Sequence, residues 1–158
     1  MFGLFKSKKI IIVSPADGDV VELSEVPDEV FSAKLAGDGV ALMPRSNTFV
    51  APVAGEVTKI FSTNHAFSIR TKDGLEVLVH IGLDTVELNG EGFKRLAQEG
   101  ESVSVGKPII SADLAFIEAQ GKPIVTPIVV NHEKDLKLNI DVIKTIREGQ
   151  NLIEVEIK

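Results

Sequence analysis

Residues 61–88 read FSTNHAFSIRTKDGLEVLVHIGLDTVEL and contain two of the three histidines of this 158-residue chain, His65 and His80. Each of the two lies in a run of residues typical of a β-strand. Between the runs stands Thr71-Lys72-Asp73-Gly74, whose Asp-Gly pair is a strong signal for a hairpin turn. The segment therefore predicts an antiparallel hairpin, and its register decides whether the two imidazoles meet.

Three loop lengths are open for this hairpin. If residues 71–74 form a four-residue loop, His65 faces His80 directly, with Cβ atoms roughly 4.5–5.5 Å apart. If Asp73 and Gly74 alone form the loop, His80 faces Phe67, and His65 is a diagonal neighbour on the same face. A three-residue loop would put the histidines on opposite faces. Two of the three loops pair the imidazoles, so we predict a register that pairs them.

The neighbours of the two histidines are those of a reactive site rather than of isolated strand residues. Gly82 lets backbone or ligand approach His80 closely, Thr63 can share a strand face with His65, and Asp84 can orient or polarise an imidazole. The flanking residues are apolar: Phe61, Phe67, Leu78, Val79 and Ile81. Such surroundings suit a site that another protein covers during the reaction.

Composition limits the classes of function. The length suits one domain, and the net charge of −6 argues against a nucleic-acid partner. Cysteine is absent from the sequence, which excludes disulfides, thiol nucleophiles and thiolate zinc sites. None of the apolar runs approaches the roughly 20 residues that a membrane-spanning helix needs. We expect a cytoplasmic protein.

Short strands separated by glycine-containing turns predict an all-β fold, an antiparallel β-sandwich or barrel with short helical turns. We expect a flexible N-terminal arm over residues 1–9, making at most weak membrane contact, and a single domain over residues 10–158. An internal repeat relates residues 14–23 to residues 51–60, each with Pro-x-x-Gly before an acidic residue and valine, and predicts two similar halves. Helical turns are expected within residues 23–31, 93–98 and 113–120. The third histidine, His132, is expected to be a solvated turn residue.

Three kinds of chemistry suit a pair of facing imidazoles. In the first, one imidazole is a nucleophile that carries a phosphoryl group and the other donates a hydrogen bond to phosphoryl oxygens. In the second, His65, His80 and Asp84 bind zinc in a hydrolase, with water as the fourth ligand. In the third, the pair is structural and the protein is a binding module. The apolar flanks favour a surface to which a protein docks, and the first kind needs no cofactor and no metal.

Two motifs resemble the glucose-family enzyme IIA of the bacterial phosphoenolpyruvate-dependent sugar phosphotransferase system. They are TNHAFSI at residues 63–69 and VHIGLDTVEL at residues 79–88. Further matching segments cover residues 26–31, 37–39, 51–55 and 91–95, so the resemblance spans roughly residues 10–158. The initiating Met1 favours a free-standing protein over part of a longer permease.

The resemblance implies a phosphotransferase component that works through a phosphohistidine. His80 would accept phosphate on Nε2 from the histidine-containing phosphocarrier protein and pass it to a cysteine on the enzyme IIB domain of a sugar permease. His65 would stabilise the phosphoryl group, Thr63 would orient His65, the Gly82 carbonyl would hold the other nitrogen of His80, and Asp84 would border the site. The residues of the docking patch would be Val30, Phe31, Phe61, Phe67, Leu78 and Val86. Leu78 replaces a phenylalanine found in some relatives, which makes the patch less aromatic.

Overall fold

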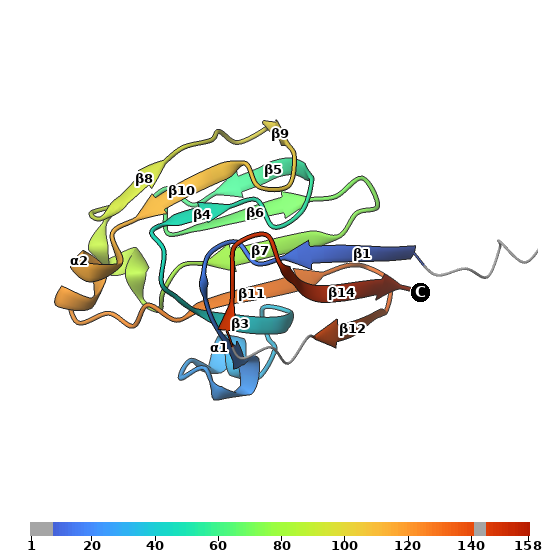
Figure 1. The fold of residues 1–158 in the computed structure, drawn as a ribbon, viewed down its shortest axis with the longest axis horizontal. Helices are drawn as coiled ribbons and strands as arrows, with labels where there is room; N and C mark the ends of the chain where they lie inside the picture. Colours follow the sequence, from blue (N-terminus) through green and yellow to red (C-terminus); the bar gives the residue numbers. More distant parts are fainter. Residues whose placement is uncertain (1–7, 141–144) are drawn as a thin grey trace, which may run out of the picture.

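The chain folds almost entirely into antiparallel β-structure in a computed structural model that describes residues 8–140 and 145–158 (Figure 1). The strands are β1 (Lys8–Val13), β2 (Gly18–Glu22), β3 (Asp38–Pro44), β4 (Thr48–Val50), β5 (Gly55–Ile60), β6 (Ala66–Arg70), β7 (Glu76–His80), β8 (Phe93–Arg95), β9 (Ser102–Val103), β10 (Pro108–Ala112), β11 (Thr126–Asn131), β12 (Leu136–Ile140), β13 (Thr145–Ile146) and β14 (Asn151–Ile157). The short helical elements are η2 (Leu23–Glu25), α1 (Glu29–Ser32), η3 (Thr85–Leu88) and α2 (Leu114–Ala119). The expected all-β class with short helical turns is confirmed.

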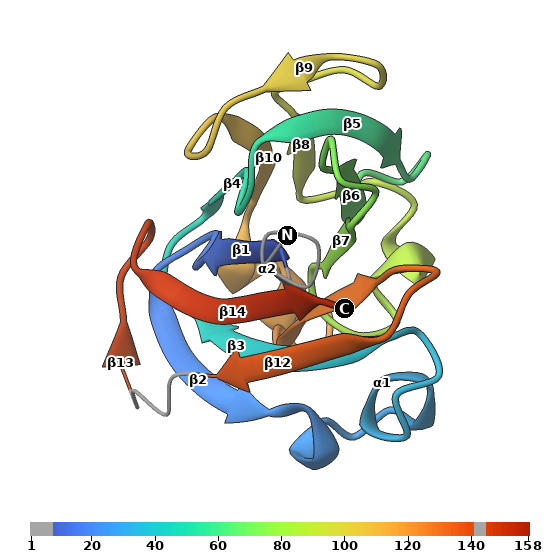
Figure 2. The ribbon, with the colours of Figure 1, turned by 90° about the vertical axis from the view of Figure 1, so that its right-hand side faces the viewer.

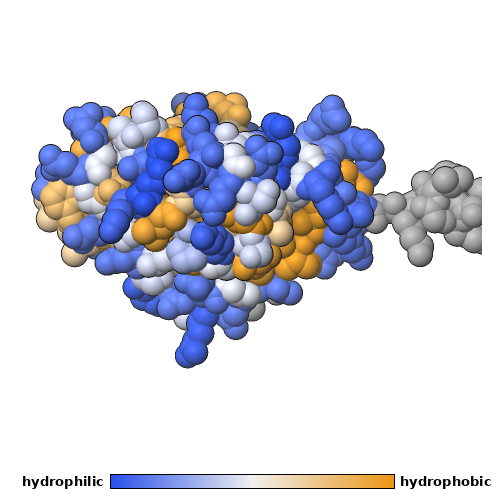
Figure 3. All heavy atoms as spheres, turned by 90° about the horizontal axis from the view of Figure 1, so that it is seen from above, coloured by the Kyte–Doolittle hydropathy of each residue, from blue (hydrophilic) through white to orange (hydrophobic). Residues whose placement is uncertain are grey.

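Within the described residues the strands form one large sheet and two small ones. The large sheet has the order β13-β2-β3-β11-β7-β6-β5-β9, and the small sheets have the orders β1-β14-β12 and β4-β10-β8. Figure 2 shows β1 and β14 across the middle of the molecule, with β2, β3 and β12 on one side and β5, β6 and β9 on the other. Figure 3 views the molecule from the side of β5 and β9, where apolar residues form several separate patches between hydrophilic ones, as is ordinary for a protein surface.

The main core lies between the large sheet and the two small ones. It joins Phe67 and Val79 of the large sheet to Phe49 and Ile110 of one small sheet and Val155 of the other, all five with no exposed surface. Strand alternation sends neighbouring side chains to the opposite face of the large sheet. There a second apolar cluster forms beneath η2 and α1, and the candidate site is built on it.

The internal repeat is a structural repeat. Its two copies enter strands β2 and β5 at Gly18 and Gly55, and the turns before them exchange backbone hydrogen bonds. The Val13 amide donates to the Pro52 carbonyl and the Val50 amide donates to the Pro15 carbonyl, both at 2.9 Å. Since the repeat has an offset of 37 residues, these two bonds are equivalent. The starts of the two copies are thus reciprocally bonded to each other's half.

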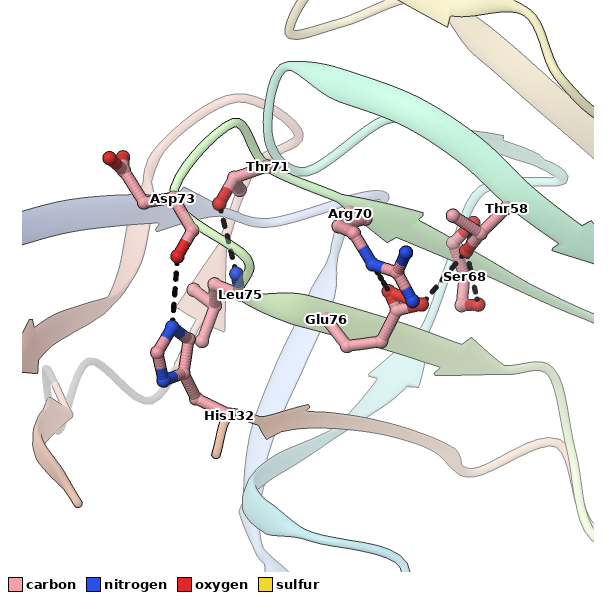
Figure 4. Close-up of polar contacts among 8 residues, drawn as sticks. All are labelled: Thr58, Ser68, Arg70, Thr71, Asp73, Leu75, Glu76 and His132. Atoms are coloured by element: carbon pink, nitrogen blue, oxygen red, sulfur yellow. Dashed lines mark hydrogen bonds and ion pairs between the residues drawn. The ribbon is translucent and has the colours of Figure 1, made fainter. Parts of the chain in front are cut away.

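The hairpin of β6 and β7 takes the three-residue loop, so the register that we predicted is wrong. Ala66 faces His80 and Arg70 faces Glu76. The ladder continues to Thr71, whose amide donates to the Leu75 carbonyl at 2.9 Å. The Thr71 hydroxyl accepts from the Leu75 amide at 3.1 Å (Figure 4). The turn therefore consists of residues 72–74.

His132 is a half-buried structural residue, not the solvated turn residue that we expected. The Lys134 amide donates to its Nδ1 at 2.9 Å, so Nδ1 is an acceptor and the ring proton is on Nε2. Nε2 lies 2.9 Å from the carbonyl oxygen of Asp73, in the turn between β6 and β7 (Figure 4). His132 thus ties the segment after β11 to the neighbouring hairpin.

Two local expectations fail because pairing with distant strands decides the local structure. Residues 93–95 form strand β8 instead of a helical turn, since they pair with Ala112, Ser111 and Ile110 of β10. Strand β1 begins at Lys8, which pairs with Ile157, so the expected arm of residues 1–9 loses its last two residues to the sheet. Residues 1–7 lie outside the described residues. The helix expected at 113–120 is confirmed as α2, with Asp113 accepting from the Phe116 amide at its N-cap.

Candidate functional site

His65 lies in a loop, and this is why the two imidazoles meet in spite of the register. The Phe61 amide donates to the Ala66 carbonyl at 3.0 Å, which closes a four-residue loop between β5 and β6. Asn64 has a left-handed backbone, with φ 59°, so strand alternation does not set the direction of the next side chain. The ring centroids of His65 and His80 are 5.0 Å apart, with the ring planes at 80°. The expected pairing of the rings is confirmed, by a different route.

His80, the last residue of β7, has its tautomer fixed by the backbone two residues later. Its Nδ1 lies 2.8 Å from the Gly82 carbonyl oxygen. Because a carbonyl oxygen only accepts, Nδ1 carries the proton, and in the neutral ring Nε2 keeps a free lone pair. Gly82 has φ 77°, and a Cβ at this position would lie 2.6 Å from Thr85 Cγ2 and 2.8 Å from the Pro123 carbonyl oxygen. Glycine is thus the residue that this turn requires.

The Thr63 hydroxyl is the polar partner of the His65 ring. Thr63 Oγ1 is 2.5 Å from His65 Nδ1, and the hydroxyl can donate or accept there. If the hydroxyl donates, the ring proton of neutral His65 is on Nε2. The backbone of His65 is also held, since the Ile81 amide donates to its carbonyl at 2.7 Å.

Both imidazoles have lowered pKa values. Burial, and to a smaller extent the neighbouring His80, lowers the pKa of His65 from its ordinary value to about 4. Burial also lowers the pKa of His80, while the bond to Gly82 and the charges of Asp28 and Asp84 oppose this shift. Both rings are therefore neutral at pH 7, and a neutral imidazole is the nucleophilic form.

Asp28 and Asp84 act on His80 through their charge. Asp28 caps α1 by accepting from the Val30 amide at 2.9 Å, and Asp84 has a left-handed backbone with φ 56° before η3.

The zinc alternative fails, because within residues 8–140 and 145–158 no group of three His, Cys, Asp or Glu side chains could hold a metal ion. His65, His80 and Asp84 are thus not the ligand set of a zinc hydrolase.

Apolar side chains surround the two rings. The Phe61 ring lies 5.2 Å from His65 in an edge-to-face arrangement, and the Phe31 ring lies 5.0 Å from His80, centroid to centroid. Phe31 itself is buried in the second apolar cluster, against which Leu78 packs. Val30 and Val86 are 49% and 52% exposed, so they offer apolar surface to a visiting protein.

Phe67 does not belong to the proposed docking patch. It has no exposed surface and packs in the main core. In the observed register its side chain points to the core face of the sheet with Val79, while His80 points to the other face. The family resemblance implied a place for Phe67 in the docking patch, and its burial in the main core shows that this expectation is wrong.

Thr85 is a site residue that the sequence reasoning missed. Its side chain is fully buried, and its hydroxyl donates to the Ile81 carbonyl at 2.7 Å. The Leu83 amide donates to the Pro123 carbonyl at 3.0 Å. Together these bonds fix the turn that presents the Gly82 carbonyl to His80. The available signal was a threonine three residues after a glycine that follows a strand, which is weak without the coordinates.

The fold and site define an all-β protein with two neutral imidazoles set in an apolar surface. Residues 10–136 match the family described as phosphoenolpyruvate-dependent sugar phosphotransferase system, EIIA 1. The chain belongs to this family, and so is a glucose-type EIIA component of a sugar phosphotransferase system.

Curated relatives and a solved structure agree with this assignment. The chain is 45% identical over 148 residues to the PTS system glucose-specific EIIA component of Haemophilus influenzae, covering 94% of this chain and 89% of the relative. It is 51% identical over 124 residues to the PTS system N-acetylglucosamine-specific EIICBA component of Klebsiella pneumoniae, covering 78% of this chain and 19% of that longer protein. The glucose permease IIA of Mycoplasma capricolum superposes with a TM-score of 0.87 at 38% identity, covering 93% of this chain and 96% of that chain.

Among the described residues, every helical element falls short of the length and apolar character that a membrane-spanning helix needs.

Proposed function

We propose that His80 is the phosphoryl acceptor of this EIIA component. Nε2 of His80 attacks the phosphorus of a phosphohistidine on the histidine-containing phosphocarrier protein. The new Nε2–P bond forms as the P–N bond of the donor breaks, and the donor histidine leaves with the electron pair. A cysteine thiolate on the enzyme IIB domain of a sugar permease then attacks the same phosphorus, and His80 leaves as a neutral imidazole.

One observation carries this proposal, the 2.8 Å contact between His80 Nδ1 and the Gly82 carbonyl oxygen. It directs the ring proton to Nδ1 and leaves Nε2 with its lone pair. The lowered pKa of His80 keeps the ring neutral at pH 7. A neutral, oriented imidazole is the form that covalent catalysis by histidine requires.

His65 is proposed to stabilise the transferred group. With the Thr63 hydroxyl donating to Nδ1, the Nε2–H of His65 is free to donate to phosphoryl oxygens on His80, whose ring centroid lies 5.0 Å away. Phosphoryl transfer depends mainly on positioning and on stabilisation of charge, so few groups suffice. Phe61, Val30 and Val86 supply apolar contact for the partner, with Phe31 and Leu78 beneath them.

The experiment is labelling with phosphoenolpyruvate in the presence of the two upstream proteins of the system. The wild-type chain should gain one acid-labile phosphate. His80→Ala should take none, and His65→Gln should take the label but pass it on slowly. Full labelling of His80→Ala would refute the assignment.

A further inference from the structure

The loop that carries His65 is held by an arginine from a different sheet. Arg95 Nε donates to Asn64 Oδ1 at 2.9 Å, and Arg95 Nη2 donates to the Phe61 carbonyl at 3.3 Å. Arg95 is the last residue of β8, where it pairs with Ile110 of β10. A single guanidinium thus joins both ends of the 61–64 turn to the small sheet β4-β10-β8.

Arg95 contacts the loop at the two residues that set its shape, Phe61 and Asn64. The Phe61 carbonyl already accepts from the Asn64 amide at 2.7 Å, and Asn64 has the left-handed backbone that turns the chain towards His65. Thr63, the hydroxyl partner of His65, lies between the two residues that Arg95 contacts. A fork of parallel donors holds two acceptors in a fixed relation, which a single-point cation cannot do.

We propose that Arg95 is a positioning residue for phosphoryl transfer, which fixes the 61–64 turn and thereby holds the Thr63–His65 pair in line with His80. The inference rests on the proposed function of His80 and His65 and assigns a role to a residue outside their contacts. Arg95 touches neither imidazole in the interactions described above, so it acts through the loop. A misplacement of about 1 Å in a catalytic group can cost up to about a hundredfold in rate.

Four variants test the proposal. Arg95→Met keeps the length of the side chain and removes both donors, and Arg95→Lys keeps the charge but not the fork. Asn64→Gly removes the acceptor and tolerates the left-handed backbone. Arg45→Met is the matched control, because Arg45 is an exposed arginine whose contact is Asp19 at 2.8 Å, away from the loop.

Two readouts are needed, the rate of phosphoryl transfer from the labelled chain to an IIB domain and the ¹⁵N chemical shifts of His65. Arg95→Met should slow transfer about tenfold, within the hundredfold cost of misplacement, and Arg95→Lys should fall between it and wild type. In Arg95→Met, the nitrogen shifts of His65 should move towards a mixture of tautomers, and the pKa of His65 should move from about 4 towards its ordinary value. Arg45→Met should match wild type in both readouts.

The outcomes separate this inference from the proposed function. Wild-type rates in Arg95→Met, with or without altered nitrogen shifts, overturn the positioning role. If the wild-type chain takes no label, the proposed function fails, and the nitrogen shifts still report whether Arg95 orders His65. If Arg95→Met does not fold, Arg95→Lys and Asn64→Gly decide, and the double variant of Arg95→Met and Asn64→Gly should be no slower than the worse single one.

Discussion

Burial controls the protonation of His65, and this has a consequence for stability. The pKa of His65 is lowered to about 4 in the folded chain, against an ordinary value of 6.5. Between these two pH values the unfolded chain binds the proton and the folded chain does not. The free energy of unfolding should therefore rise with pH through this window, by at most about 3 kcal/mol from this residue, and stay level above it.

Urea denaturation of the wild-type chain and of His65→Gln at a series of pH values measures this contribution. Carboxylates also titrate at the acidic end, but both proteins contain them, so the difference between the two curves isolates His65. The difference should change between about pH 4 and 6.5 and be constant at higher pH. Parallel curves over the whole range would show that the ring is not protected in the folded state.

Thr85 is expected to influence the His80 ring through the turn that presents the Gly82 carbonyl to it. In Thr85→Val the shape is kept, but the buried Ile81 carbonyl loses its 2.7 Å donor. An unpaired buried acceptor costs about 1–3 kcal/mol, and the turn that presents the Gly82 carbonyl is released. Thermal unfolding and the ¹⁵N shift of His80 Nδ1 should both change in Thr85→Val. Thr85→Ser, which keeps the hydroxyl, should stay near wild type, and an unchanged Nδ1 shift in Thr85→Val would contradict this account.

At the scale of elements, the hairpin separates what the sequence predicts from what it does not. The alternation in β7 correctly indicates Val77 and Val79 on one face and His80 on the other. The loop length depends on the bond between the Thr71 hydroxyl and the Leu75 amide, which no local pattern of hydrophobicity reports. The pattern of hydrophobicity also does not reveal the left-handed backbone at Asn64, so it did not predict that His65 lies outside the strand.

Phe67 lies in the main core and not in the docking patch, and a pair of variants tests this difference. Phe67→Ala should cost about 3–5 kcal/mol of stability, because it opens a cavity in the main core. Val86→Ser should leave stability within about 0.5 kcal/mol, because Val86 lies 52% exposed in η3. It should instead raise the KM for the phosphocarrier protein by up to about tenfold, from lost apolar contact. Denaturation and steady-state kinetics on both variants distinguish the two roles, and a stable Phe67→Ala would argue against its burial.

Across the whole molecule, the sequence is informative where a feature is repeated or local and uninformative where distant strands meet. The all-β class, the helix at 113–120 and the internal repeat follow from turn residues and periodicity. Strand β8 follows from its pairing with β10, and the clamp by Arg95 from packing between two sheets. Functional motifs stand out for a different reason, because residues 63–69 and 79–88 resemble a known family. The matching segments contain Thr85 and Arg95, but they do not reveal that Thr85 donates to the Ile81 carbonyl or that Arg95 donates to the Asn64 side chain and the Phe61 carbonyl.

The repeat itself makes a prediction about the two halves. A Cβ at Gly18 would lie 2.3 Å from the Met43 carbonyl oxygen, and a Cβ at Gly55 would lie 2.2 Å from the Arg70 carbonyl oxygen. In each copy the glycine therefore permits the close approach of a neighbouring strand, β3 in one half and β6 in the other. Gly18→Ala and Gly55→Ala should each destabilise the chain by about 1–3 kcal/mol or more, since backbone must move to make room.

Gly100→Ala is the comparison for these two variants. No atom lies within 4 Å of a Cβ at Gly100, so its cost comes from its left-handed backbone, with φ 85°, and should be about 1–2 kcal/mol. Chemical denaturation of the three variants gives the ranking. Because Gly55 begins β5, the strand that leads into the His65 loop, Gly55→Ala should also slow phosphoryl transfer. Gly18→Ala, in the half without the histidines, should lose stability with transfer kept. Equal stability of either variant to wild type would mean that the matching glycines do not serve the matching strand contacts.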